Sequence, residues 1–309
     1  MPPSFSITLE EHVVFPSLGS DRPSYNDIWK VFSEAKRALE DHSTGRIADL
    51  DEGHVSFQIM SHLPGMSNHN VDGCRKANDE MAEAIKKNSN RLGGFASLPM
   101  ASPDKAAAEV ERAVKELGLL GAMIDTERLD VPLYIHPGPP EDTRVKEMFS
   151  GSYSEVITQG LSTGAWGWHE DVGLHVVKLY SAGVFARFPG LKHIIGHMGE
   201  MIPMMIDRTD SLKFYEKSSL GRFRDVWDRN IGVTSSGMFS VRTLEMLLRV
   251  TKMDRVIYSI DTPFNKSILG WKYLQELSEQ SLLSKEELEM FSYGNAKRLL
   301  KLDLELQKT

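Results

Sequence analysis

The amino-acid sequence predicts an α/β fold, a (β/α)8 TIM barrel that occupies residues 1–309 as one domain. Strand-like and helix-like segments alternate through most of the chain, which is typical of a parallel sheet built from βα units. A length of 309 residues suits one barrel of this kind. Residue types that bind metal ions follow several of the apolar runs, and barrel enzymes have their active sites where the strands end.

Eight short apolar runs have the length and composition of buried strands. They cover residues 7–9, 55–60, 92–96, 119–124, 132–135, 193–195, 231–235 and 256–260. Helical spacing of apolar residues predicts helices at 78–87, 174–185 and 243–248. The number of strands is the number that a closed barrel of this class requires.

Two further helices are predicted from the residues at their ends. Ser102 at the N-cap position and Pro103 at the first helical position start a helix that Gly118 ends. Nearer the C-terminus, Ser284 and Glu287 have the spacing of a capping box. These helices are expected to cover the outside of the barrel.

The connection between the fourth and fifth strands is unusually short. It consists of the residues from Asp125 to Val131, whereas a parallel crossover normally takes a dozen or more residues and contains a helix. Extended chain of this length spans roughly 23 Å, enough to return along the barrel but not to form a covering helix as well. Either the barrel lacks one outer helix, or this stretch has been shortened.

Composition limits the classes of partner. The chain carries 36 basic and 43 acidic residues, a formal net charge of −7, without a basic block, so neither nucleic acid nor a membrane surface is expected to attract it. A small-molecule partner is expected instead. No window approaches the ~18 apolar residues of a membrane-spanning helix. The single cysteine, Cys74, and an N-terminus without a secretory signal favour the cytoplasm.

Four residues at strand ends form a predicted metal site. Glu10 and His12 lie two apart, so on a strand both side chains point to the same face. His136 follows the fifth strand and Asp261 follows the eighth. A Glu-x-His pair alone would be read as the opening of a loop, but the four together suit one divalent ion. Zn²⁺ is the expected ion, with Mn²⁺ or Mg²⁺ as alternatives.

His197 and Glu200 form a predicted acid/base pair. Imidazole titrates near neutral pH, and a nearby carboxylate orients it and tunes its pKa. His197 could instead be a fifth ligand or cap the next helix. Arg208 lies eight residues after Glu200, which on a helix puts both on one side and would let Arg208 bind an anionic substrate. The alternative for Arg208 is an ordinary surface salt bridge.

Three other residues are predicted to contact the substrate. Trp168 would wall a pocket for a planar ring and His169 would hydrogen-bond a polar group, with core packing as the alternative for both. His62 follows another strand and would reach the same site, or serve a structural role. The sequence contains no Gly-rich phosphate loop, dinucleotide fingerprint or Gly-x-Ser-x-Gly motif. The chemistry therefore depends on the predicted metal site.

Several motifs in combination resemble the amidohydrolase-related decarboxylases. This is the family of aminocarboxymuconate-semialdehyde decarboxylase and of the γ-resorcylate, 2,3-dihydroxybenzoate and 5-carboxyvanillate decarboxylases. The motifs are Leu9-Glu10-Glu11-His12, Tyr134-Ile135-His136-Pro137, Gly196-His197-Met198-Gly199-Glu200 and Ser259-Ile260-Asp261-Thr262-Pro263-Phe264. The resemblance covers nearly the whole chain and implies a barrel of the metal-dependent hydrolase type that forms a homodimer or homotetramer.

The resemblance also implies individual roles. The four strand-end residues would hold one divalent metal, His197 with Glu200 would form the acid/base pair, and Arg208 matches a basic residue near the substrate. Family members carry a long loop and a helix that overhang the active site between the fourth and fifth strands, where this chain is short. Thr262 stands where the family usually has an aromatic residue, so an altered pocket is expected.

The reaction implied is non-oxidative decarboxylation of an ortho-hydroxy aromatic carboxylic acid of the hydroxybenzoate type. The metal would bind the substrate, and protonation of the ring carbon would release CO₂. Either the His197–Glu200 pair or Asp261 would deliver the proton, and the histidine is favoured because a metal-bound aspartate is a poor acid. Two alternatives stay open: a hydrolase of the same superfamily acting on a lactone or amide, and an impaired, non-catalytic relative.

Overall fold

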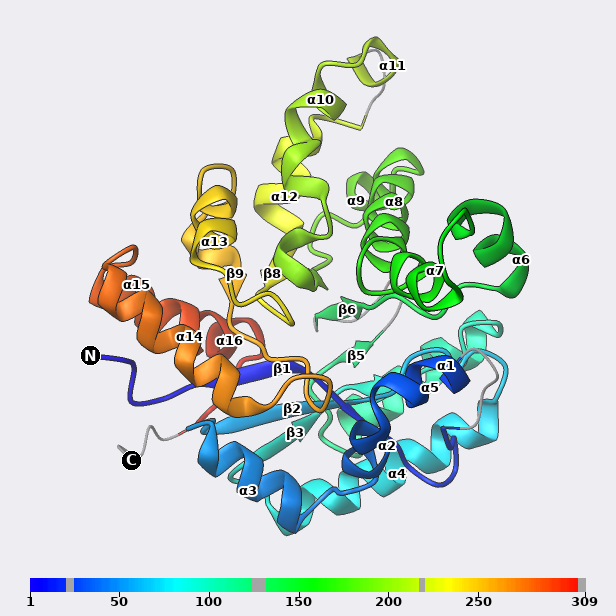
Figure 1. The fold of residues 1–309 in the computed structure, drawn as a ribbon, viewed down its shortest axis with the longest axis vertical. Coiled ribbons are helices and arrows are strands. Elements are labelled where there is room, and N and C mark those ends of the chain that lie inside the picture. The colour runs from blue at the N-terminus through cyan, green and yellow to red at the C-terminus, as the bar shows by residue number, and fades with distance from the viewer. Residues whose placement is uncertain (21–24, 124–131, 217–219, 305–309) are drawn as a thin grey trace.

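Parallel strands form the centre of the molecule in the computed structural model, which describes residues 1–20, 25–123, 132–216 and 220–304 (Figure 1). The strands are β1 Ile7–Val13, β2 Phe57–His62, β3 Leu92–Gly94, β4 Ala96–Ser97, β5 Ala122–Met123, β6 Leu133–Ile135, β7 His193–Ile195, β8 Ile231–Thr234 and β9 Val256–Ile257. Each of the eight predicted strands overlaps one of these, and the third is divided at Phe95 into β3 and β4.

Hydrogen bonds between the first and last strands close the ring. The order β1-β2-β3 continues through Phe95, whose backbone N–H donates to Met60, into the order β4-β5-β6-β7-β8-β9. Beyond β9, the N–H of Asp261 donates to the carbonyl of Glu10 at 3.1 Å, and the N–H of His12 donates to the carbonyl of Thr262 at 2.7 Å. The predicted (β/α)8 barrel is confirmed.

A bulge in β1 directs the side chains at its carboxyl end. The pairing of β1 with β2 shifts between Thr8 and Glu11, as one extra residue in β1 requires. Leu9 therefore packs in an apolar cluster with strand residues such as Ile59, while Glu10 and His12 face the metal-binding side. β1 continues to Val13, so these two predicted ligands lie on the strand itself and not in the loop after it.

Helices surround the strands. They are α1 Asn26–Val31, α2 Ser33–Leu39, α3 Thr44–Glu52, α4 Val71–Lys87, α5 Pro103–Lys115, α6 Asp142–Arg144, α7 Glu155–Ser162, α8 Gly167–Ser181, α9 Val184–Arg187, α10 Ile206–Asp210, α11 Lys213–Glu216, α12 Phe223–Asn230, α13 Val241–Leu248, α14 Ser267–Gln280, α15 Lys285–Glu289 and α16 Asn295–Leu299. Single 3₁₀ or π turns occur at Val145–Phe149, His197–Gly199, Ile202–Met204, Met253–Arg255 and Met290–Gly294. The helix predicted at 78–87 begins earlier, as α4, and the one at 174–185 is divided between α8 and α9.

The predicted helix ends are largely confirmed. Pro103 occupies the first position of α5 and Ser102 is its N-cap residue, as predicted, although the Ser102 side chain accepts no capping hydrogen bond. Gly118 has a φ of 72°, a left-handed conformation that glycine adopts without strain. Ser284 and Glu287 form the predicted capping box, with bonds of 3.1 and 2.8 Å.

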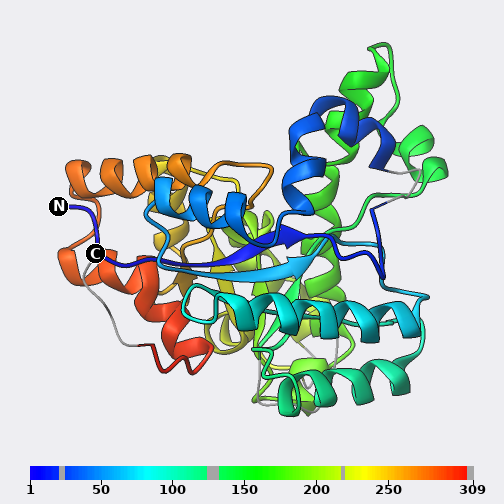
Figure 2. The same ribbon diagram turned by 90° about the horizontal axis from the view of Figure 1, so that it is seen from below.

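The short helices after β1 and β6 lie at the carboxyl end of the strands. α1 and α2 follow β1, and α6 and α7 follow β6, so both groups extend from the end at which those strands finish (Figure 2). The short connection predicted from Asp125 to Val131 lies outside the described residues, and the strands that flank it pair directly, with Ala122 opposite Leu133. Within the described part of the chain, no helix is both long and apolar enough to cross a membrane.

Candidate metal centre and acid/base site

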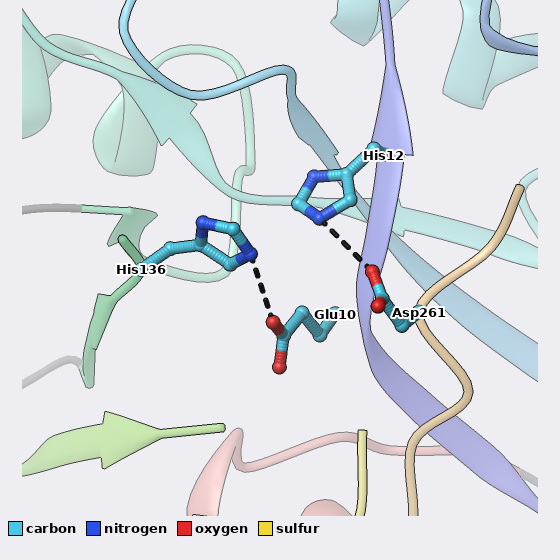
Figure 3. Close-up of side chains that lie close together, drawn as sticks. All are labelled: Glu10, His12, His136 and Asp261. Atoms are coloured by element: carbon cyan, nitrogen blue, oxygen red, sulfur yellow. Dashed lines mark ion pairs between the residues drawn. The ribbon is translucent and has the colours of Figure 1, made fainter. Parts of the chain in front are cut away.

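The four predicted ligands meet at the carboxyl end of the barrel (Figure 3). One ligand atom from each of Glu10, His12, His136 and Asp261 lies within 4.8 Å of the others. Nε2 of His136 is 2.9 Å from Oε1 of Glu10, and Nε2 of His12 is 3.4 Å from Oδ1 of Asp261. Residues that are far apart in the sequence thus form one compact set of nitrogen and oxygen donors.

Two neighbours orient this set. Nδ1 of His136 donates to the carbonyl of Pro137 at 2.7 Å, which directs Nε2 towards Glu10. The hydroxyl of Tyr134 donates to Oε2 of Glu10 and also contacts Oγ1 of Thr234 at 2.8 Å. Sequence reasoning missed Tyr134, although its position two residues before His136 on a strand was a usable signal that both side chains share a face.

The donor set fits a divalent cation. Because Nδ1 of His136 bonds to the carbonyl of Pro137, Nε2 is the ring nitrogen that faces Oε1 of Glu10. That oxygen is buried and accepts no hydrogen bond of suitable geometry within the described residues. A buried carboxylate oxygen and an imidazole nitrogen that converge in this way are suited to share one cation, and imidazole nitrogens with carboxylates are ligands of Zn²⁺ and Mn²⁺.

The protonation states agree with metal binding. Burial raises the pKa of Glu10, but His197 and His136 outweigh it and hold that pKa well below its usual range, so Glu10 is a carboxylate. Burial lowers the pKa of His12 to about 4, which leaves a neutral imidazole with an available lone pair. Burial and the charge of Glu10 raise the pKa of Asp261 to about 7. A bound cation would favour its ionised form.

Glu200 lies between two histidines beside the metal-binding residues. Its Oε1 accepts from Nδ1 of His197 and its Oε2 from Nδ1 of His169, each at 2.7 Å. Nε2 of His197 is 3.7 Å from Glu10. Burial lowers the pKa of His197, but Glu200 and Glu10 outweigh it and raise that pKa to about 10. His197 is therefore an imidazolium at neutral pH, with Glu200 as its buried counter-ion.

An unusual backbone conformation places this pair. Five successive residues have positive φ angles, 49° at His197, 57° at Met198, 96° at Gly199, 52° at Glu200 and 66° at Met201. Left-handed conformations at the non-glycine residues each cost about 1 kcal/mol or more, and such strain is typical of functional sites. The turn brings Nδ1 of His197 onto Glu200, three residues later.

The same turn corrects the prediction for Arg208. The expected common side for Glu200 and Arg208 assumed a continuous helix, but Glu200 lies in the left-handed turn and Arg208 belongs to a separate helix, α10. Arg208 is exposed and is not among the residues that line the pocket. Within one chain, Arg208 therefore does not contact a ligand held beside the metal-binding residues.

The predictions for the other substrate contacts are partly corrected. Trp168 and His169 both line the pocket. However, Nδ1 of His169 bonds to Glu200 and Nε2 bonds to the carbonyl of Gly164 at 2.8 Å, so both ring nitrogens are already occupied. His169 holds Glu200 in place, and its predicted hydrogen bond to the substrate is not supported by this geometry.

His62 has a structural role. Its Nε2 accepts from the N–H of Phe15 and its Nδ1 donates to the carbonyl of Leu63, both at 3.1 Å. His62 is buried and does not line the pocket, so the predicted substrate contact is wrong. Burial lowers the pKa of His62 to about 4, as its acceptor role at Nε2 requires.

We expect His62 to make the protein acid-sensitive. Its pKa is lower in the folded chain, about 4, than the ordinary 6.5, so the folded state loses stability as the pH falls from about 6.5 to about 4. The loss attributable to this group approaches about 3 kcal/mol. Urea unfolding at both pH values should show a smaller acid-induced loss in His62→Gln than in the wild type, and an unchanged loss in the exposed control His69→Gln. An equal loss in all three proteins would contradict the assignment.

A cavity of about 620 Å³ opens onto the metal-binding and acid/base residues. Its lining includes His12, His136, Asp261, His197 and His169. Its remaining lining is largely apolar and includes Tyr25, Ile28, Phe32, Leu63, Val156, Trp168, Met238 and Phe264. Polar lining residues that sequence reasoning missed are Lys30, Glu155, Gln159, Thr163 and Asn265. Thr262 is buried and does not line the cavity, which corrects the expectation that this residue alters the pocket directly.

A closed parallel barrel with two histidines and two carboxylates at its carboxyl end defines a metal-dependent enzyme. The chain belongs to the amidohydrolase family, whose sequence pattern (Amidohydro_2) matches residues 12–302. The resemblance found in the sequence motifs is thereby confirmed.

Within the amidohydrolase family, the relatives similar in sequence include decarboxylases. Decarboxylase orsB of Emericella nidulans is 38% identical over 98% of both chains. The γ-resorcylate decarboxylase of Rhodococcus jostii is 30% identical over 96% of this chain and 98% of its own length. Among solved structures, dihydroxybenzoic acid decarboxylase from a Polaromonas species, with bound manganese and the inhibitor 2-nitroresorcinol, matches with a TM-score of 0.83 and 27% identity, covering 96% of this chain and 97% of that one.

Proposed function

We propose that this protein catalyses the metal-dependent, non-oxidative decarboxylation of an ortho-hydroxy aromatic carboxylic acid. The observation that carries the proposal is the position of a protonated His197, held by Glu200, beside the four metal-binding side chains in one cavity. The similarity to decarboxylase orsB and to the γ-resorcylate decarboxylase of Rhodococcus jostii supports the same reaction class.

Each group has a distinct task in this reaction. Glu10, His12, His136 and Asp261 would hold the divalent ion, which supplies positive charge for the oxygens of the substrate. His197 would donate the proton at Nε2 to the ring carbon that bears the carboxylate. The carbon–carbon bond to the carboxylate then breaks, its electron pair returns to the ring, and CO₂ leaves. Glu200 would stabilise the imidazolium before the transfer, through Nδ1.

The pKa values of the two groups favour His197 over Asp261 as the proton donor. His197 has a pKa raised to about 10, so it carries a proton at neutral pH, whereas Asp261 has a pKa raised to about 7 and would lose its proton beside a bound cation. A ligand that must stay ionised to hold the metal cannot deliver a proton without leaving it. The residue types, a histidine and a metal-bound aspartate, predict the same choice of proton donor.

The ion is proposed to be Zn²⁺ or Mn²⁺. The residue types favour Zn²⁺, and the Polaromonas relative was crystallised with manganese. Two imidazole nitrogens and two carboxylates accept either ion. Plasma mass spectrometry of the purified, gel-filtered protein identifies the ion, and activity of chelated protein restored with each ion shows which one supports turnover.

Product analysis tests the reaction class. The enzyme should release CO₂ from 2,6-dihydroxybenzoate or a related ortho-hydroxybenzoate and form the corresponding phenol. A hydrolase of the same superfamily would instead open a lactone or cleave an amide, with water added to the product and no CO₂ released. Hydrolysis without CO₂ release across a panel of both substrate types would overturn the proposal.

We expect apolar ring substituents to improve binding. A cavity of about 620 Å³ is large for a single-ring acid, and its lining includes apolar side chains such as Ile28, Phe32 and Val156. Each buried methylene should contribute up to about 0.8 kcal/mol, or a roughly fourfold lower KM. The measurement is kcat and KM for ortho-hydroxybenzoates with ring hydrogen, methyl and propyl. Val156→Ser should reduce the benefit of the propyl group, and a KM that rises with substituent size would contradict the expectation.

We also propose a homo-oligomer, a homodimer or homotetramer, in the cytoplasm. Exposed apolar side chains on α7 and next to the turn at Ile202–Met204 support self-association, among them Val156, Ile157, Met204 and Met205. The only cysteine, Cys74, is a buried free thiol, as suits a reducing compartment. Light scattering coupled to gel filtration tests the oligomeric state.

A further inference from the structure

A buried polar network lies behind the metal-binding residues, on the side away from the cavity. Its centre is Glu11, which lies between the ligands Glu10 and His12 on β1 and is completely buried. The bulge in β1 turns Glu11 towards the chain segment after β9, where Asp261 lies. Glu11 and Asp261 come from opposite ends of the sequence, so their contact depends on closure of the barrel.

Glu11 accepts four hydrogen bonds from that segment. Oε1 accepts from Oγ of Ser259 at 3.1 Å and from the N–H of Ile260 at 3.0 Å. Oε2 accepts from both the N–H and the hydroxyl of Thr262, each at 2.7 Å. The carboxylate thus holds the backbone immediately before and immediately after Asp261.

Asp261 needs this support because its backbone conformation is unfavourable. Its φ is 75°, in the left-handed region that a residue with a side chain rarely adopts. Conformations of this kind persist only where the surroundings hold them, and they cost about 1 to 3 kcal/mol. Releasing either flank of Asp261 would let the segment relax and move its carboxylate away from His12.

The hydroxyl of Thr262 connects Glu11, through Gln58, to the buried guanidinium of Arg46. Nη1 of Arg46 donates to Oε1 of Gln58 at 2.7 Å, and this fixes the orientation of the Gln58 amide. Nε2 of Gln58 then donates to Oγ1 of Thr262 at 3.2 Å, which leaves the Thr262 hydroxyl hydrogen for Glu11. Each donor in this series of hydrogen bonds has one acceptor. Arg46 also donates to the carbonyl of His12 at 2.7 Å.

We propose that Thr262 is a positioning residue of the metal site, whose hydroxyl, with Glu11, holds Asp261 in its ligand geometry. In this chain the polar network holds the backbone on both sides of Asp261. The inference concerns metal binding alone and does not depend on which reaction the site catalyses.

Titration of chelator-treated protein with Co²⁺, followed by visible absorption, tests the proposal. The spectrum reports both the dissociation constant and the coordination geometry. Thr262→Val keeps the side-chain volume and removes the hydroxyl, so it should raise the dissociation constant for Co²⁺ about 10-fold to 100-fold and change the spectrum. Thr262→Ser restores the hydroxyl and should return both values to within about twofold of the wild type.

Thr251→Val is the matched control. Thr251 is also buried, and its hydroxyl accepts from Nε1 of Trp227 at 3.0 Å, away from the metal-binding residues. This variant loses a hydrogen bond and should lose stability on heating, with Co²⁺ affinity unchanged. Equal Co²⁺ affinities and identical spectra for Thr262→Val and Thr251→Val would overturn the proposal.

A second variant keeps the test decisive if Thr262→Val does not fold. Gln58→Leu removes the donor that orients the Thr262 hydroxyl but leaves Glu11 and every metal ligand in place. It should weaken Co²⁺ binding and broaden the absorption bands, because the Thr262 hydroxyl is then free to rotate away from Glu11. Co²⁺ affinity and spectrum identical to the wild type in Gln58→Leu would count against the network. A wild type that binds no Co²⁺ would overturn the metal site itself.

Discussion

Replacing His12 and Asp261 together with alanine is expected to remove the bound ion and abolish decarboxylation. The double substitution removes one nitrogen and one carboxylate donor, which lie 3.4 Å apart, and leaves only Glu10 and His136 of the four ligands. Two protein ligands do not retain a divalent ion through gel filtration when the site is built for four. Metal analysis should therefore fall from about one ion per chain to none, with CO₂ release reduced to background.

The control for this experiment is the double variant His69→Ala with Asp303→Ala. Both residues are exposed, and the change in composition is the same. Circular dichroism of all three proteins establishes that the barrel is folded. An ion retained in full by the His12→Ala, Asp261→Ala protein, or CO₂ release at the wild-type rate without any ion, would show that these residues do not form the metal site.

Replacing His197 with glutamine is expected to lower kcat by roughly 10²-fold to 10⁴-fold, the usual contribution of a positioned general acid. Glutamine can still donate to Glu200 but has no acidic proton to give to the ring carbon. The metal content should stay near one ion per chain, because none of the four ligands is changed. Loss of kcat with the ion retained would separate proton transfer from metal binding.

The pH profile adds a second readout for His197. The reactive form is the imidazolium, which Glu200 and Glu10 stabilise against burial by raising its pKa to about 10. For the free enzyme, kcat/KM should therefore stay high on the acid side of this pKa and fall on its alkaline side, at a pH below about 10 because the bound cation offsets part of the charge of Glu10. His197→Gln should lack that alkaline decline, whereas the exposed control His69→Gln should keep it. An alkaline decline that persists in His197→Gln would assign it to another group.

The two variants distinguish the chemical roles of adjoining groups in one cavity. Nε2 of His197 is only 3.7 Å from Glu10, so the proposed proton donor and the proposed metal ligands share one electrostatic environment. Glu10 is kept ionised by its histidine neighbours, and His197 is kept protonated by Glu10 and Glu200. Each charge thus stabilises the other in a buried site where an unpaired charge would be costly.

Much of the fold could be predicted from local sequence patterns. The strand and helix periods are local properties, so the eight strands, the helix after Pro103 and the capping box at Ser284 were found without tertiary information. The grouping of the four candidate metal ligands was also predicted, because parallel strands of a barrel all end on one side and a residue after one strand must lie near those after the others.

Local patterns failed where the backbone departs from regular geometry. Helical spacing put Arg208 on the same side as Glu200, but five successive left-handed residues precede α10 and break that relation. His62 and His169 were assigned to the substrate because they follow a strand or lie near tryptophans. Their ring nitrogens are taken by backbone and carboxylate partners that only the folded chain brings within reach.

The sequence by itself therefore determined the class of barrel, the donor types suited to a divalent ion and the four residues proposed to supply them. Tertiary structure alone decided the partners of those residues. The bulge in β1 and the pairing of β1 with the chain after β9 put Glu11 against Thr262, and the left-handed turn puts Glu200 between His197 and His169. These contacts join residues that are distant in the sequence or separated by irregular backbone, where neither periodicity nor spacing carries information.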